Sequence, residues 1–551
     1  MEPGVKWFAK GSNGFTESLF RFALRLWMAV GLLSLDASTF PAPIPLPQLS
    51  QRVLADAETT YRAPYAGSRL RTMAQKESDI ISLADWPGVD LSGCSDSTAG
   101  IQAAVDAVTG TKNGYYSGKG PLPVPVKFFV PNGTLMLNGT VFCPIGCSFE
   151  GNNSIIDLKD NRTEAAFTYN SEYDGPSIFV CAQTVFRGFQ IIGDSSKPNL
   201  KTYIVKIYRM PYFTMENIAS YYNQIANIIG ESILTRFFHV INYRPVGIGW
   251  ALSRGSGAFG PNFCTADACY CEEGQANDVT GFSVSSGSMS ISDTYIEAIQ
   301  IMFAVGHDAG FTVGPGCSLN VRPSVLWAHQ SGITQVIFKI TGNQTALRMT
   351  DCSVAFAGGS ENNNYGFLVT PDATGASIQL SNVQFSCQAP AATSEVTIFK
   401  LAAPLTGTVS GCQFIVPQAN SSRLNILDTT SHDGCTANLP FIGCVFRGAI
   451  FSSGNPDSIN FELNGGSTVT GGYTAPITGN FFYRTTNFTN CSNAVLSGNI
   501  FINSQPLIFI DRPNFSARCI ISSNSFNLAP KISNPGMISN NGMLQDVTLP
   551  P

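Results

Sequence analysis

Apolar and polar positions alternate over short stretches along most of this chain, and turn residues separate the stretches. Between Ser97 and Val108, apolar residues instead recur every three or four residues. This spacing predicts one amphipathic helix of about three turns, beginning at Ser97 or Thr98. A β run, Val126 to Val130, follows and ends at a Pro-Asn-Gly turn. One helix followed by many short strands predicts a helical cap over a stack of strands.

From about residue 120 to residue 530 the chain carries a degenerate internal repeat. Its form is an apolar residue, Ser or Thr, then Asp, Asn or Gly, two variable positions and a large apolar residue. The copies begin at Ile291, Met349, Leu380, Val409, Phe441, Ile477, Leu496 and Ile521. Their large apolar positions include Phe385, Phe414, Phe446, Phe482, Phe501 and Phe526, which are 19 to 36 residues apart.

This repeat fits one rung of a parallel β-helix. A strand is followed by a turn at the Asp, Asn or Gly position, where left-handed backbone is tolerated, and then by a strand whose Phe points inward. Successive rungs stack about 4.8 Å apart, so like residues lie over like. We therefore expect internal ladders of Phe, Asn and Cys. A Rossmann or TIM-barrel fold is excluded because helical segments do not alternate with the strands.

Four segments carry a family resemblance: ISLADW, DSTAGIQAAVDA, FFVPNGTLML and FEGNNSIIDL, all between Ile81 and Leu158. Together they resemble the first part of the pectate-lyase-like right-handed parallel β-helix superfamily, in particular the tailspikes of tailed bacteriophages. The lead-in from Ser68 to Trp86 is similar to the phage version. The family usually has Gly-Asp-Gly after the Asp-Trp step, where this chain has Pro87-Gly88-Val89-Asp90. The resemblance implies an all-β, right-handed parallel β-helix solenoid with an N-terminal capping helix and a short attachment segment.

The predicted organisation has four parts. Residues 1–60 form an N-terminal virion-attachment segment with a Pro-rich linker, and residues 61–120 form the lead-in and capping helix. Residues 121–530 form the β-helix, and residues 531–551 a C-terminal cap or tail. Two arginines interrupt the apolar run from Leu19 to Leu35, and its unbroken part is too short to span a bilayer. That run is either a signal or anchor, or a helix that docks on another protein.

The charge composition limits the kinds of partner that this chain is expected to bind. Charged residues make up 13% of the chain, against about 25% in an average globular protein, which suits a surface built of turns. The net charge of −5 gives no basic footprint, so nucleic acid is not an expected partner. The net charge does not exclude an acidic polysaccharide, because local patches decide that.

The chain has 15 cysteines, an odd number. Cys352, Cys412 and Cys444 occupy one position of the repeat, which favours reduced thiols stacked in a core. The spacing of Cys264, Cys269 and Cys271 matches no common zinc pattern, so a loop with buried or paired thiols is preferred to a metal site. The middle of the chain also lacks an Asp cluster with metal-ligand spacing. No cofactor is therefore expected.

Glu297 is the first catalytic candidate. Alternation turns it outward beside Tyr295, and other copies of the repeat need no acid at its position. Glycoside hydrolysis requires two carboxyl groups about 5–5.5 Å apart for retention, or about 6.5–9.5 Å for inversion. Asp293 is a turn residue that would lie about 13 Å away along an extended strand. Asp308 and Asp278, in glycine-flanked loops, are the candidate partners. The alternative for Glu297 is a solvated surface residue.

Candidate substrate-binding residues are Trp250, Arg254, Tyr295 and Trp327. Trp250 and Arg254 lie in the longest non-repetitive stretch, Tyr243 to Gly274, where aromatic faces and guanidinium groups suit sugar rings and carboxylates. The alternative is that Trp250 packs back onto the coil.

The resemblance implies a homotrimeric virion tailspike that binds and cleaves a bacterial surface polysaccharide, a capsule, O-antigen or exopolysaccharide. Its N-terminus would attach to phage tail, baseplate or adaptor proteins. Two alternatives remain open: a non-catalytic receptor-binding or structural spike, and a secreted pectinase-like enzyme, which a genuine signal peptide would favour. If the chain is an enzyme, a glycoside hydrolase is favoured over a lyase, because the middle of the chain lacks an Asp cluster for calcium-dependent elimination.

Overall fold

The structure is a computed structural model in two units, Met1–Ser78 and Asp79–Pro551. It describes residues 60–62, 70–72, 81–113, 125–170, 183–196, 202–256, 259–275, 279–322, 334–356, 364–387, 395–415, 423–428, 437–447, 459–462, 476–482, 486–489, 495–502, 508–510, 520–528, 531–532, 537–539 and 542–543. In the first unit, β1 (Thr60–Arg62) and β2 (Leu70–Thr72) form an antiparallel pair. The predicted attachment segment, including the run from Leu19 to Leu35, lies outside the described residues.

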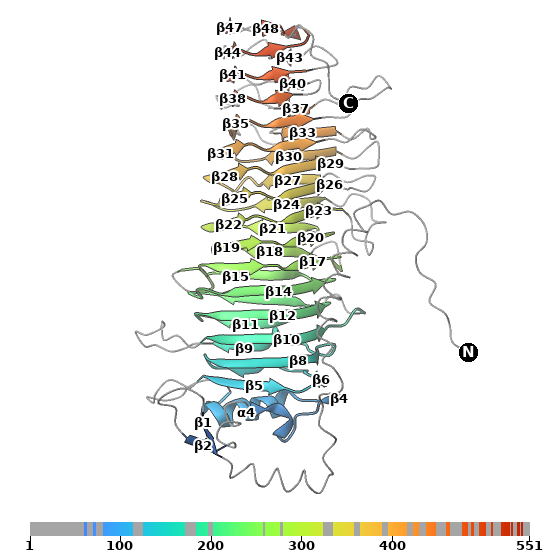
Figure 1. The fold of residues 1–551 in the computed structure, drawn as a ribbon, viewed down its shortest axis with the longest axis vertical. Coiled ribbons are helices and arrows are strands. Elements are labelled where there is room, and N and C mark those ends of the chain that lie inside the picture. Colours follow the sequence, from blue (N-terminus) through green and yellow to red (C-terminus); the bar gives the residue numbers. More distant parts are fainter. Residues whose placement is uncertain are drawn as a thin grey trace, which may run out of the picture. The chain divides into compact units, whose positions relative to one another are not determined.

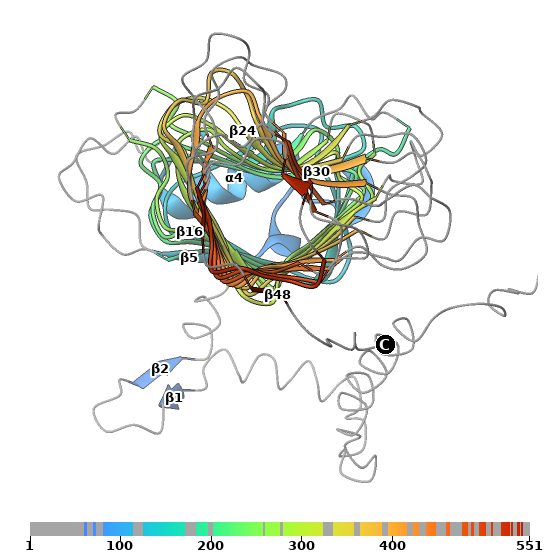
Figure 2. The same ribbon diagram turned by 90° about the horizontal axis from the view of Figure 1, so that it is seen from above.

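In the second unit, strands stack in chain order in three columns, which we name faces A, B and C (Figure 1). Seen from above, the columns enclose the core (Figure 2). Face A is a parallel sheet of 15 described strands: β7 (Val141–Cys143), β9 (Ala165–Asn170), β11 (Tyr203–Tyr208), β13 (Gln224–Ile229), β15 (Ile248–Ser253), β18 (Thr280–Val284), β21 (Ile301–Val305), β24 (Gln335–Ile340), β27 (Asn364–Val369), β30 (Glu395–Leu401), β33 (Arg423–Asp428), β37 (Ile459–Glu462), β40 (Thr486–Thr489), β43 (Ile508–Ile510) and β46 (Lys531–Ile532).

Faces B and C meet at a corner. Face B comprises β3 (Ile81–Ser82), β5 (Val126–Val130), β16 (Cys264–Asp267), β19 (Gly287–Ser292), β22 (Ala309–Val313), β25 (Ala346–Thr350), β28 (Ala376–Ser381), β31 (Leu405–Ser410), β34 (Ala437–Asn438), β35 (Phe441–Ile442), β38 (Pro476–Thr478), β41 (Val495–Ser497), β44 (Ile520–Ser522) and β47 (Met537–Ser539). Face C comprises β4 (Ser92–Asp96), β6 (Thr134–Met136), β17 (Tyr270–Glu272), β20 (Tyr295–Glu297), β23 (Ser318–Val321), β26 (Ser353–Phe356), β29 (Gln384–Cys387), β32 (Gln413–Ile415), β36 (Val445–Arg447), β39 (Phe481–Phe482), β42 (Ile500–Phe501), β45 (Ser525–Phe526) and β48 (Gly542–Met543). Four long strands run across both faces: β8 (Cys147–Asp157), β10 (Thr184–Ile192), β12 (Phe213–Tyr221) and β14 (Arg236–Tyr243).

The Asp, Asn or Gly position of the repeat forms the corner between faces B and C, as predicted. A left-handed residue occupies this corner in rung after rung, with φ of 46° at Asp293, 50° at Asp351 and 55° at Asn382. Glycine fills it in later rungs, at Gly411, Gly443, Gly479 and Gly498. Glycine pays no steric cost there, and Asp and Asn tolerate the conformation better than most residues.

Two aromatic ladders fill the core. On face C, the rings of Phe385, Phe414, Phe446, Phe482, Phe501 and Phe526 stack with successive centroid distances of 5.2, 4.8, 4.6, 4.7 and 5.0 Å. This single buried column confirms the predicted Phe ladder. On face A, a second ladder runs through Trp250, Phe282, Phe303, Phe338, Phe367 and Phe399.

The position before each face C strand carries the predicted Cys and Asn ladders. Cys412 and Cys444 are fully buried free thiols. In later rungs the position becomes Asn, and Asn480 donates to Oδ1 of Asn499 at 3.0 Å, which in turn donates to Oδ1 of Asn524 at 2.9 Å. Each buried amide thus finds partners above and below it, as a buried polar group requires.

The predicted capping helix is α4 (Thr98–Thr109), which follows the short 3₁₀ turn η2 (Leu83–Asp85). Its apolar stripe, including Ile101 and Val105, is buried at the N-terminal end of the core. The backbone N–H of Phe142, in β7, donates to Oε1 of Gln102 at 2.7 Å, and Nε2 of Gln102 donates to the Phe142 carbonyl at 3.1 Å. The Gln102 amide therefore pairs with the edge of face A as another strand would. Neither helix among the described residues has the length and apolarity of a membrane span.

Candidate functional site

Strands β17 and β20 carry the same pattern, Tyr-x-Glu, in the same register on face C. Tyr270 pairs with Tyr295, and Glu272 pairs with Glu297, across neighbouring rungs. The residue between the two outward side chains points into the core, as alternation along a strand requires, and Ile296 is fully buried. Two phenols and two carboxylates are therefore stacked in two adjacent columns on the outside of the coil.

One guanidinium group faces three carboxylates at this position. Arg322, which follows β23, places Nη2 2.9 Å from Oε1 of Glu273 and 3.9 Å from Oε1 of Glu272. Its Nε donates to Oε1 of Glu297, which also accepts a 2.8 Å hydrogen bond from Nδ2 of Asn320. Three acids share this cation, so the fully ionised cluster carries net negative charge and favours the uptake of a proton.

Each tyrosine donates its hydroxyl to the glutamate two residues further along its own strand. Tyr270 donates to Oε2 of Glu272, and Tyr295 donates to Oε2 of Glu297. Burial, together with the hydrogen bond and charge of the partner glutamate, raises the pKa of both phenols. Both hydroxyls therefore remain protonated donors at neutral pH, and each holds one carboxylate oxygen in position.

The surroundings of Glu272 favour its protonated form. Burial raises its pKa above the ordinary value of 4.5, and the nearby charges of Glu297 and Glu273 raise it further. The hydrogen bond from Tyr270 and the charge of Arg322 act in the opposite direction but do not cancel the rise. A carboxyl group with a raised pKa beside a second carboxylate is the arrangement that general acid catalysis uses.

The backbone turns sharply immediately after the glutamate column. Arg244, Glu273 and Ala298, in three successive rungs, have φ of 54°, 58° and 53°. As at the corner between faces B and C, this left-handed conformation recurs from rung to rung and forms a turn of the coil. The turn also places the Glu273 carboxylate against Arg322.

Aromatic side chains extend the site towards the N-terminal rungs. Tyr243 is in register with Glu272, and Tyr221 is in register with Tyr243. The rings of Tyr221 and Tyr243 meet edge to face at 5.8 Å. The Arg244 guanidinium lies 5.1 Å from the centroid of the Tyr243 ring, and its Nη1 donates to the Tyr222 hydroxyl at 2.9 Å. Such a surface offers ring faces and hydrogen-bonding tips next to the acids.

The structure brings together two of the predicted site residues, Glu297 and Tyr295. Asp308 lies at the corner between faces A and B, where it is exposed and its Oδ2 is 3.6 Å from Nε2 of His307. Strand β21 separates that corner from Glu297, so these two carboxylates do not share a site. Asp278 lies outside the described residues.

The prediction of an exposed Trp250 is wrong. Its ring is fully buried and stacks on Phe282 with a centroid distance of 4.4 Å, so it offers no face to a sugar. The stretch 243–274 is not one irregular loop, because it supplies β15, β16 and β17. Arg254 is exposed in the turn after β15, and Trp327 lies outside the described residues.

In the described part of the chain, no group of three His, Cys, Asp or Glu side chains is arranged to hold a metal ion. Cys264, Cys269 and Cys271 are buried free thiols. Burial raises the pKa of Cys264 and of Cys269 to about 12, so both thiols are protonated at neutral pH in this packing.

No protein-family model matches this sequence, and no curated protein matches it. Among solved structures, a double mutant of the tailspike protein of E. coli bacteriophage HK620 matches with a TM-score of 0.54 at 11% identity, over 85% of each chain. Another mutant of that tailspike, in complex with a pentasaccharide, matches with a TM-score of 0.51 at 10% identity, over 84% of each chain. The chain has a tailspike-like parallel β-helix. At this identity the likeness shows the fold alone, and it agrees with the predicted right-handed coil.

The site residues predicted from the sequence did not include Tyr270, Glu272 or Arg322. The signal for the first two is a further copy of the repeat, Ala266-Asp-Ala-Cys-Tyr-Cys-Glu272, which is in register with Ile291–Glu297. This copy escapes the pattern because Ala268, with φ of 51°, occupies the corner where most other copies have Asp, Asn or Gly. Arg322 follows its strand and belongs to no repeated position.

Proposed function

We propose that this chain is a bacteriophage tailspike that binds and hydrolyses a bacterial surface polysaccharide: a capsule, O-antigen or exopolysaccharide. The observation that carries the proposal is the register pair of Glu272 and Glu297 on neighbouring strands. Neighbouring strands lie about 4.8 Å apart, close to the roughly 5–5.5 Å that separates the two carboxyl groups of retaining glycosidases. The pentasaccharide bound by the HK620 tailspike mutant, which shares the fold, supports a glycan as the ligand.

In the proposed reaction Glu272 is the general acid and Glu297 is the nucleophile. Glu272, with its raised pKa, gives its proton to the glycosidic oxygen as the bond to the anomeric carbon breaks. Glu297, whose carboxylate is positioned by Tyr295 and Arg322, attacks that carbon and forms a glycosyl ester. Glu272, now a carboxylate, then takes a proton from water, which hydrolyses the ester with net retention of configuration.

The test compares Glu272→Gln and Glu297→Gln with the wild type on a panel of purified capsular, O-antigen and exopolysaccharides. Each variant is expected to release reducing ends about 10²–10⁴-fold more slowly while still binding the glycan. The anomeric configuration of the first product, followed by NMR, is expected to be that of the substrate. Glu216→Gln is the matched control, because Glu216 lies on β12 in an ion pair with Arg187. Full activity in both site variants would remove this pair from the mechanism, and Asp308 and Asp278 would be tested next.

One observation favours a non-catalytic spike. Glu297 is only 8% exposed, and its carboxylate already accepts hydrogen bonds from Tyr295, Asn320 and Arg322. If the wild-type protein only binds its glycan, it will show measurable affinity for that glycan but release no oligosaccharide at any protein concentration. The same panel separates this function from hydrolysis.

The proposal places the protein in the virion as a homotrimer, with residues 1–60 attaching it to phage tail, baseplate or adaptor proteins. Deleting these residues is expected to leave a glycan-binding trimer that no longer assembles on particles, as judged by light scattering and particle sedimentation. Loss of the trimer in this deletion would make the segment part of the folded body instead.

A further inference from the structure

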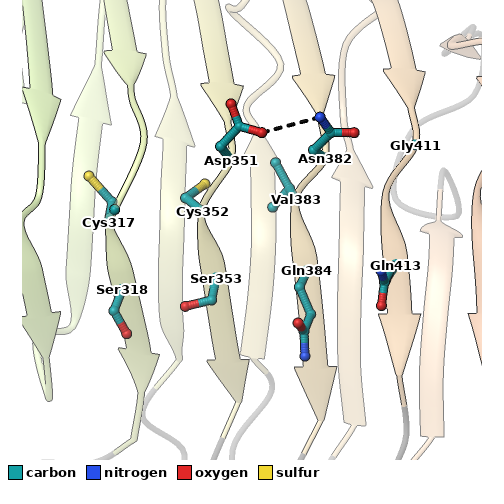
Figure 3. A pocket seen from close by; sticks show the side chains of 11 residues that line it. Cys317, Ser318, Asp351, Cys352, Ser353, Asn382, Val383, Gln384, Gly411 and Gln413 are labelled. Atoms are coloured by element: carbon teal, nitrogen blue, oxygen red, sulfur yellow. Dashed lines mark hydrogen bonds between the residues drawn. The ribbon is translucent and has the colours of Figure 1, made fainter.

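Beyond the acids, face C continues as a polar hollow of about 420 Å³ (Figure 3). Four outward side chains form a column along it: Ser318, Ser353, Gln384 and Gln413, on β23, β26, β29 and β32. The column is continuous with the site, because Ser318 is in register with Tyr295. A ligand that lies over the tyrosine column and extends along the coil axis would therefore reach this hollow next.

The corner between faces B and C forms the second wall of the hollow. Asp351 and Asn382 stand side by side there, joined by a 3.2 Å hydrogen bond from Nδ2 of Asn382 to Oδ1 of Asp351 (Figure 3). Gly316 and Gly411 occupy the corner at either end of this pair. A Cβ added at Gly411, where φ is +61°, would lie 2.6 Å from Oδ1 of Asn382. Because glycine has no side chain, it does not narrow the hollow at this corner.

The side chains of the column are free to bind a ligand. Ser318, Ser353, Gln384 and Gln413 make no side-chain hydrogen bond to any other described residue. Each glutamine amide offers donors and an acceptor, and each serine hydroxyl offers both, which matches the hydroxyl groups of a sugar. The column repeats at the strand spacing of about 4.8 Å, which is similar to the length that one hexose adds to an extended glycan.

The charge of the hollow narrows the ligand further. Of the described residues that line it, Asp351 alone is charged, and none is Lys or Arg. The nearest cation of the site, Arg322, is already engaged by Glu297 and Glu273. The carboxylate of a uronic or sialic acid would lie beside Asp351 with no cation to offset the repulsion between like charges.

We propose that this hollow binds an uncharged stretch of the polysaccharide, with the Ser318–Gln413 column pairing with the hydroxyl groups of successive neutral sugars. The proposal rests on the proposed function, since it extends the same site along the glycan. It names the substrate class: a surface polysaccharide with neutral hexose or hexosamine units on this side of the cleaved bond.

The experiment uses the full-length protein and a panel of neutral and uronate-containing bacterial polysaccharides, with affinities measured by calorimetry. The polysaccharide that binds best is then oxidised at its primary hydroxyls to give a uronate-containing partner of the same backbone. The variants are Gln384→Lys, Gln413→Lys and the double change. Thr406→Lys, which adds the same charge at an exposed position on face B outside the hollow, is the control.

The expected result is that the tightest-binding polysaccharide is neutral and that oxidation lowers its affinity at least tenfold. The lysine variants should recover affinity for the oxidised polymer at low salt and lose about fivefold for the neutral one for each hydrogen bond removed. Thr406→Lys should change neither affinity. A uronate polymer that binds as tightly as the neutral ones, or lysine variants that behave like the control, would overturn this inference. Either result could coexist with full hydrolase activity, whereas an absence of cleavage with normal neutral-glycan binding would count against the proposed function alone.

Discussion

Tyr270 and Tyr295 stack face to face, with ring centroids 5.1 Å apart and planes 11° from parallel. The stack joins two neighbouring rungs, and each hydroxyl reaches the glutamate of its own strand, Glu272 or Glu297. The two carboxylates are therefore held in equivalent orientations one rung apart. The spacing of the acids depends on this pair of phenols as well as on the sheet.

Tyr295→Phe is expected to slow polysaccharide cleavage without unfolding the site. The ring stack stays, but Oε2 of Glu297 loses its phenolic donor. A hydrogen bond to a charged group contributes about 1.5–3 kcal/mol, so kcat should fall about 10- to 100-fold if the bond acts in the transition state. Tyr208→Phe is the control, since Tyr208 lies in β11 on face A, away from the two glutamates. Equal rates for the two variants would remove Tyr295 from the positioning of the nucleophile.

The raised pKa of Glu272 predicts a stability effect with a definite sign. Because the folded-state pKa lies above the unfolded value of 4.5, the proton stabilises the fold at low pH, and this stabilisation is lost as pH rises through the folded pKa. Glu272→Gln, which cannot ionise, should therefore be more stable than the wild type at neutral pH. The difference should shrink as pH falls towards 4.5. Denaturant unfolding at several pH values measures it, and a variant less stable at pH 7 than at pH 4.5, relative to wild type, would contradict the assignment.

The same group predicts the pH dependence of activity. An acid catalyst works only while it holds its proton, so kcat should fall as pH rises through the Glu272 pKa. That descending limb should lie above the pH at which an ordinary glutamate ionises. A pH–rate profile for kcat checks it, and a limb at or below pH 4.5 would assign the general acid to another residue.

Phe446→Ala is expected to destabilise the coil by about 3–5 kcal/mol, the usual cost of emptying a buried aromatic position. Its ring is fully buried between Phe414 and Phe482, at 4.8 and 4.6 Å. Phe481→Ala is the matched control, because Phe481 precedes Phe482 on the same strand, points outward and is 38% exposed. Thermal unfolding should give a large loss for the first variant and a small one for the second. Similar losses would mean that the ladder is not the main source of cohesion at these rungs.

Asp293 is expected to act through its backbone. Its φ of 46° suits glycine and penalises β-branched residues. Asp293→Gly should therefore leave stability nearly unchanged, whereas Asp293→Val should lower it by about 1–2 kcal/mol or more. Both variants should retain glycan cleavage at temperatures where they are folded. A loss of activity in folded Asp293→Gly would point to a chemical role for its carboxylate.

The coil could be predicted because its repeat is a physical requirement at each rung. The corner needs a left-handed residue, which is why Asp293, Asn382 and Gly411 mark it in the sequence. The inward position needs a side chain that packs on its own copy above and below, which is why Phe414 and Phe446 recur. The capping helix could also be predicted, because the apolar stripe of α4 must be buried and the end of the coil is the surface it can cover.

The site was only half visible. Glu297 stood out because an acid is unnecessary at its repeat position. Its partner Glu272 did not, because Ala268 hides the corner of that rung and the pattern is lost. The placement of Trp250 could not be predicted, because an aromatic residue among glycines can lie on a surface as well as in a core. Its burial follows from its pairing with Phe282 on face A, which the sequence alone does not show. The contact between Arg322 and Glu272 joins positions two rungs apart, so no local sequence pattern predicts it.

The hydrogen bonds between Gln102 and Phe142 give the growth of this molecule a direction. They cover the outer edge of β7, the first strand of face A among the described residues, and the other edge of β7 pairs with β9. A chain synthesised from its N-terminus would add rungs in the order in which they emerge, each completed rung serving as the template for the next. Until the last strands are in place, the growing end exposes unpaired backbone to any similar chain nearby. The yield of folded protein should thus depend on whether one chain completes its rungs before its exposed strands meet those of a second chain.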